Sequence, residues 1–312
     1  MKSLPRLFRW LMIAALIDWL IGRTFTRSAM FMPKSPVMVL IYQTLGSIGQ
    51  VAFTLTGLLA LMAIAWIAWR ARNRPVLAGA LLLSAALSVL FVFVAPLGWW
   101  AVLAHALVLI VISAWLARVW RGTIDPAEKV AITLPALALL SGVLYRLLPA
   151  LAEALSLSAT PSWVSAIFNS GEALVALSPI GWWWIYRRRI SRRTYVIALV
   201  PALALSIFHF VNPAMTSILS IWSIGLTLYL PWPVYAISLW LCGAVVIEAA
   251  RRREPIGWAL LLLAASGYGP QVSTQVFVSL IGLWLMVSER LVEQPVASIF
   301  GRDLTRQSIR AI

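Results

Sequence analysis

Three residues of this sequence are suited to proton chemistry. His105, His209 and Glu172 each lie inside a long apolar stretch. An imidazole can accept and release a proton near neutral pH, and a buried carboxyl group can pass one on. Polar groups at membrane depth are costly and usually face the interior of a helix bundle. We therefore predict catalytic roles for these residues, with a histidine accepting a proton and Glu172 relaying it.

His105 and His209 are the only histidines in the chain. A haem b held across two helices needs two imidazoles at matched depth, and both residues are expected within roughly 10 Å of the outer surface. The pattern fits haem ligation by this pair, and it equally fits core histidines that form ordinary hydrogen bonds. We predict no other metal site. Cys242 is the single cysteine, which excludes a disulfide framework and a cysteine-based metal site.

A second group of polar residues is concentrated toward the side of the membrane away from the arginines. Gln271 and Gln275 are spaced i, i+4 and share a helix face. One interpretation is a single outward-facing pocket that binds a ligand such as a quinone, and the other is a scattered set of satisfied polar groups. The predicted ligand-binding residues are Asp18, Gln43, Gln50, Asn169, Asn212, Tyr268, Gln271 and Gln275.

The composition indicates which elements position these residues. The chain is 62% hydrophobic and 11% charged, with a mean hydropathy of +0.92, whereas a soluble domain carries about 25% charged residues. Lipid leaves no backbone group unsatisfied, so a crossing requires a helix of about 20 residues. We predict an all-α, polytopic integral membrane bundle of about ten transmembrane helices. It forms a single transmembrane domain over residues 1–312, with no sizeable soluble domain.

One stretch orients the bundle. Trp182, Trp183, Trp184 and Tyr186 end an apolar run, and five arginines follow within seven residues, at 187–193. Tryptophan and tyrosine are enriched at the membrane interface, and short basic loops stay in the cytoplasm. The resulting topology places 21 of the 25 Lys and Arg residues inside, with both termini cytoplasmic and a short polar tail over residues 290–312. The +15 net charge therefore indicates an inner (cytoplasmic) membrane protein rather than a nucleic-acid partner.

The predicted helices follow the apolar runs. Asp125 and Pro126 are typical of a helix start, and Glu248 is expected to pair with the arginines at 251–253. The segments 36–46, 214–230 and 256–270 could cross the membrane, re-enter it or lie in its plane. The expected helices are 8–22, 36–69, 75–95, 101–119, 130–148, 163–186, 195–211, 233–250, 256–266 and 273–288.

A weak repeat is also present. Pro36 and Pro213 each begin a long apolar segment that ends in arginines and a proline, followed by a Leu/Ala run. This layout predicts two parallel four-helix units, 8–120 and 195–289, joined by linking helices in 130–187.

Motifs of soluble enzymes are absent from the sequence, including phosphate-binding glycine loops and nucleophile elbows. We expect a membrane subunit of a quinol-oxidising electron-transfer complex, bound to other protein subunits in the lipid bilayer. One alternative is a secondary transporter for a small or lipid-like solute, proton-coupled through Glu172. Another is a non-catalytic membrane scaffold.

Overall fold

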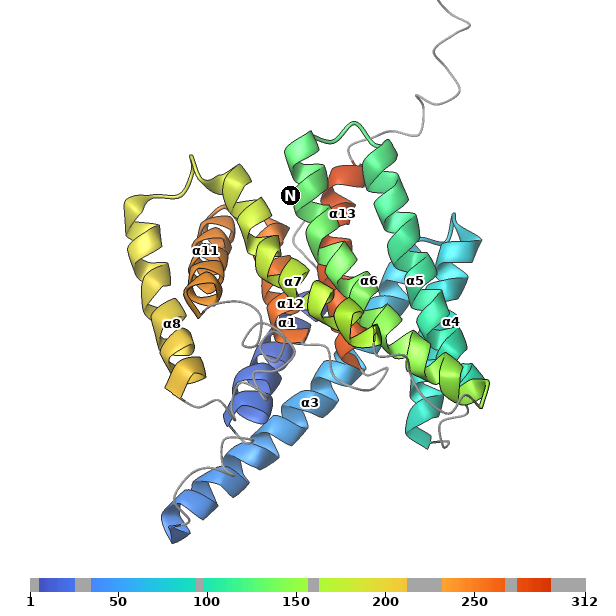
Figure 1. Cartoon of the computed structure of the whole chain (residues 1–312), viewed down its shortest axis with the longest axis horizontal. Coiled ribbons are helices and arrows are strands. Elements are labelled where there is room, and N and C mark those ends of the chain that lie inside the picture. The colour runs from blue at the N-terminus through green and yellow to red at the C-terminus, as the bar shows by residue number, and fades with distance from the viewer. Residues whose placement is uncertain are drawn as a thin grey trace, which may run out of the picture.

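The computed structural model describes residues 6–25, 35–93, 98–156, 163–211, 232–266 and 274–292, and these ranges consist of helices joined by short turns (Figure 1). The described residues form ten α-helices and one π-helical segment, and they contain no strand, which confirms the all-helical prediction. The elements are α1 (Arg6–Ile17), η1 (Asp18–Phe25), α3 (Pro36–Arg70), α4 (Pro75–Phe93), α5 (Gly98–Arg121), α6 (Pro126–Ala154), α7 (Val164–Tyr186), α8 (Arg192–Val211), α11 (Trp232–Arg251), α12 (Pro255–Ser266) and α13 (Thr274–Val292).

Proline and a polar cap set several helix starts. The side chain of Ser35 accepts a hydrogen bond from the Met38 amide at 3.2 Å, directly before Pro36 begins α3. Asp125 Oδ1 accepts from the Ala127 amide at 2.8 Å, directly before Pro126 begins α6. A capping oxygen satisfies an orphan N–H, and proline at the first helical position has none to satisfy. The predicted start at Asp125 and Pro126 is therefore confirmed.

Helix α3 matches its expected range to within one residue, whereas α6 extends beyond the expected 130–148 at both ends. Helix α3 is one continuous helix of 35 residues, including its polar first part. At 1.5 Å per residue it is about 52 Å long. The expected end of α6 at residue 148 was wrong, because the helix continues through Pro149 to Ala154. Among the described residues, Pro36–Arg70, Trp99–Arg121 and Pro126–Ala154 are long and apolar enough to cross a membrane.

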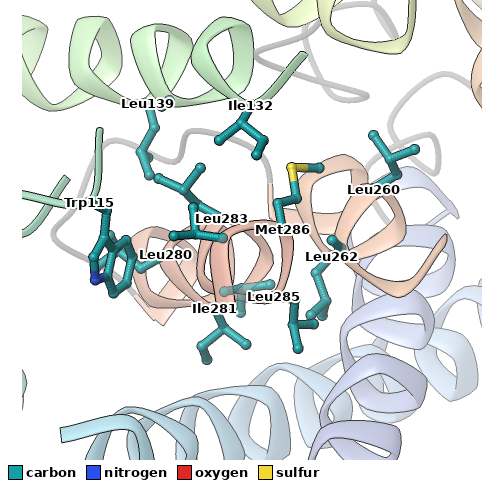
Figure 2. Close-up of a cluster of buried hydrophobic side chains, with 14 of the residues drawn as sticks. Trp115, Ile132, Leu139, Leu260, Leu262, Leu280, Ile281, Leu283, Leu285 and Met286 are labelled. Carbon is teal, nitrogen blue, oxygen red and sulfur yellow. The ribbon is translucent and has the colours of Figure 1, made fainter. Parts of the chain in front are cut away.

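Helix α13 forms the centre of the bundle. It packs against α3, α5, α6 and α12. Leu280, Leu283 and Met286 lie on the side of α13 that faces α6, whereas Ile281 and Leu285 point toward α3 (Figure 2). All five side chains are buried. Residues 276–287 of α13 are buried on every face of the helix except at half-buried Trp284, and a segment that is apolar all round belongs inside a fold.

The remaining helices pack mainly against one another. Helices α6 and α7 pack against each other, and α11 packs between α7 and α8 (Figure 1). At the opposite side of α13, the rings of Phe8, Trp66 and Trp284 pack together from α1, α3 and α13, with centroids 5.3 to 5.7 Å apart. The predicted division into two repeat units stays a prediction, since packing of neighbouring helices does not test it.

Candidate functional site

His105 is the predicted catalytic residue that the structure describes in full. It lies on α5, is only 5% exposed, and its Nδ1 is 2.7 Å from the carbonyl oxygen of Ala101. A carbonyl only accepts hydrogen bonds, so Nδ1 must carry the proton and Nε2 of the neutral ring has a free lone pair. Nε2 is buried and has no hydrogen-bond partner among the described residues. The site therefore presents a buried proton acceptor.

The neutral form of His105 suits these surroundings. A proton on Nε2 would be a buried donor without an acceptor in the described part of the chain, and such a group costs about 1–3 kcal/mol. Arg146, on the neighbouring helix α6, is close enough to act electrostatically on the ring.

The same part of α6 packs closely on α7. Ser141 Oγ donates a hydrogen bond to the carbonyl oxygen of Ile167. A Cβ atom added at Gly171 would lie 2.7 Å from Ser141 Oγ and 2.9 Å from Ser141 Cβ, so only glycine fits there. This contact fixes the backbone at position 172 beside α6. The structure does not describe the Glu172 side chain.

Asp18 lies elsewhere, where η1 meets α3. It is 2% exposed, and a Cβ at Gly22 would lie 3.0 Å from Asp18 Oδ1 and 3.2 Å from the Cα atom of Gly49. The carboxylate is therefore enclosed where two glycines let the helices approach.

Gln43 and Gln50 do not join either site. Both side chains are exposed on α3, and their backbone carbonyls accept hydrogen bonds from Ser47 Oγ and Thr54 Oγ1, each at 3.0 Å. Helix α3 packs against α1, η1, α4 and α13. The structure thus separates the two glutamines from His105.

The remaining predicted residues cannot be placed as side chains. Helix positions are described for Asn169, Glu172, His209 and Gln275 without their side chains, and Asn212, Tyr268 and Gln271 lie outside the described residues. The helix arrangement still bears on His209. Helices α5 and α8 lie on opposite sides of α6, α7 and α11 (Figure 1). Ligation of haem b by His105 and His209 stays a prediction, because the His209 side chain is not described.

The sequence predicted only part of a polar network that lies at the arginine-rich end of the bundle. Glu248 Oε1 accepts from Arg252 Nε at 2.8 Å, and its Oε2 is 4.0 Å from Arg251 Nη1, which confirms the predicted ion pair. The hydrogen bond to Glu248 raises the pKa of Arg252. Tyr186 also donates a hydrogen bond to Glu254 Oε2, across 68 residues of sequence. Nothing in the spacing of Tyr186 and Glu254 indicates that contact.

Comparisons with known proteins give no indication of function, so a function can be inferred only from these residues. No protein-family model, no curated protein and no solved structure matches the chain. Within the described residues, no group of three or more His, Cys, Asp or Glu side chains is placed to hold a metal ion.

Proposed function

We propose that this chain is an integral membrane protein whose basic turns face the cytoplasm. Three long apolar helices support this placement. So do the large apolar side chains on outer helix faces: Val37, Leu40, Val76 and Val200 are each 64 to 77% exposed. In water such surfaces would drive association, whereas acyl chains solvate them. The ten predicted crossings and the inner membrane are part of this proposal.

Within that membrane, we propose that the chain is a subunit of an electron-transfer complex that oxidises quinol, as the sequence suggested. The observation that carries it is the buried lone pair on His105 Nε2. A quinol hydroxyl is a donor that could fill this acceptor and lose its proton to it. Oxidation of one quinol releases two protons and two electrons. The electrons would pass to a redox-active partner subunit, because the described residues offer no metal cluster.

The position of His105 supports a site toward the outer leaflet. Arg118 and Arg121 mark the basic end of α5, and His105 is in its first third. At 1.5 Å per residue, His105 lies about 20 Å along the axis from Arg118. That distance places the imidazole at the end of α5 that lies away from Arg118 and Arg121.

The test is quinol binding by the purified full chain. Quenching of tryptophan fluorescence by a short-chain benzoquinol would give an affinity for the wild type and for His105→Leu, with Gln50→Ala on α3 as the control. Loss of one hydrogen bond worth about 1–1.5 kcal/mol predicts roughly tenfold weaker binding for His105→Leu alone. Equal affinities in all three proteins, together with no quinone in solvent extracts of the preparation, would remove the proposal.

A secondary transporter is the second candidate. The observation that favours it is the proline inside several long helices: Pro135 and Pro149 in α6, Pro179 in α7 and Pro201 in α8. In transporters, membrane helices that carry proline or glycine often form the substrate site. Proton-driven uptake in vesicles that disappears in Glu172→Gln would support this function. Absence of both quinol binding and transport would favour the non-catalytic scaffold.

A further inference from the structure

We propose that the turns α7–α8 and α11–α12 together bind the phosphate of an anionic phospholipid headgroup. This inference rests on the proposed membrane placement and is independent of His105. The surface in question, called the arginine surface here, consists of Arg187, Arg188, Arg189, Arg192, Arg193, Arg251, Arg252 and Arg253.

The structure holds the two turns together. Arg251 Nη1 donates a hydrogen bond to Thr194 Oγ1 at 2.6 Å, which ties the end of α11 to the start of α8. Trp240 Nε1, also on α11, donates to the carbonyl oxygen of Tyr195 at 2.8 Å. The hydrogen bond from Tyr186 to Glu254 links the end of α7 to the turn before α12. Arginines from two distant parts of the sequence are therefore held on one surface.

This surface carries the largest excess of positive charge in the described part of the chain. Its eight arginines are accompanied by only two acidic residues, Glu248 and Glu254, and both already accept hydrogen bonds. Arg188, Arg189, Arg192 and Arg193 are exposed, and none of them forms an ion pair with another described residue. By contrast, the α5–α6 turn holds Asp125 and Glu128 alongside Arg118, Arg121 and Lys129.

An apolar track beside the arginines favours a lipid over a free anion. Arg192, Val196 and Val200 are spaced i, i+4 on α8, and the two valines are 65% and 68% exposed. On α7, the Arg187 guanidinium lies 3.3 Å from the ring centroid of Trp184, whose side chain is 53% exposed. A phosphate at the arginines would thus continue into acyl chains along the valines. Basic pockets between helices on the cytoplasmic side bind such headgroups.

The experiment measures lipid-dependent thermal stabilisation of the full chain in a zwitterionic detergent. Short-chain phosphatidylglycerol is titrated against short-chain phosphatidylcholine, and inorganic phosphate forms a third arm. The test variant is Arg188→Gln/Arg189→Gln/Arg192→Gln. The matched control is Arg70→Gln/Arg72→Gln/Arg74→Gln, which removes the three arginines around the α3–α4 turn.

Phosphatidylglycerol should stabilise the wild type and the control variant, and high salt should weaken the effect. One arginine near an anionic lipid surface is worth about a fivefold change in affinity, so losing three predicts weakening on the order of a hundredfold. Equal stabilisation by phosphatidylcholine, an unchanged response in the test variant, or full stabilisation by inorganic phosphate would overturn the lipid site. If the test variant does not fold, Arg192→Gln alone should weaken binding about fivefold, and no change would equally overturn it.

Discussion

Tyr186, at the end of α7, donates a hydrogen bond to Glu254 Oε2 in the turn before α12. The tyrosine is 2% exposed, so its hydroxyl cannot exchange this bond freely for water. A hydrogen bond to a charged group in such a setting is stronger than a neutral one. The pair therefore joins two turns that both carry arginines.

Removing the Tyr186 hydroxyl should destabilise the protein. We expect Tyr186→Phe to lower the free energy of unfolding by roughly 1–2 kcal/mol, because Glu254 loses its donor. Denaturant-induced unfolding followed by tryptophan fluorescence would measure it. The control is Tyr42→Phe on α3, because the Tyr42 hydroxyl is buried without a hydrogen-bond partner among the described residues and its removal should cost little. Equal losses in both variants would contradict the role of this bond.

Gly171 should not tolerate a side chain. An added Cβ would lie 2.7 Å from Ser141 Oγ and 2.9 Å from Ser141 Cβ, so Gly171→Ala should cost about 1–3 kcal/mol of stability by overpacking. Gly79→Ala on α4 provides the opposite case, because nothing lies within 4 Å of its added Cβ. That variant should gain up to about 1 kcal/mol from helix propensity. A stable Gly171→Ala would show that α6 and α7 are not packed this closely.

Replacing His105 with leucine should weaken ligand binding without lowering the stability of the protein. Leucine in place of His105 removes a buried Nε2 that has no partner in the described part of the chain, so the unfolding midpoint should stay the same or rise. The affinity for benzoquinol should fall in the same variant. The thermal midpoint and the benzoquinol affinity, measured on one preparation, separate the two effects. A marked drop in the midpoint would instead assign His105 a structural role.

The Glu248–Arg252 pair should show favourable coupling that salt weakens. The carboxylate is nearly buried, whereas the Arg252 side chain is 42% exposed, so screening by water and ions limits the interaction. A double-mutant cycle with Glu248→Gln and Arg252→Gln measures the coupling at low and high salt. Because the hydrogen bond raises an already high arginine pKa, the Arg252 charge is lost only at extreme alkaline pH. Coupling that does not change with salt would indicate that the pair is shielded from solvent.

Local features of this fold could be predicted from the sequence. The apolar runs predict helices because lipid or a core requires every backbone group to be bonded, and the starts at Pro36 and Pro126 follow from adjacent caps. The ion pair of Glu248 with Arg252 was also predictable, because residues four apart share a helix face. In each case, the interacting groups are no more than one helical turn apart.

Only the tertiary structure decided which helices meet. The sequence suggested that Trp182 and Trp184 both sit at the membrane interface, yet Trp182 is fully buried and Trp184 is 53% exposed. It also placed His105 and His209 at matched depth. It did not indicate that their helices, α5 and α8, are separated by α6, α7 and α11. Helix faces rich in Leu and Ala resemble one another, so spacing alone does not select a partner. Close contacts such as Gly171 with Ser141 select it, and they exist only once the chain has packed.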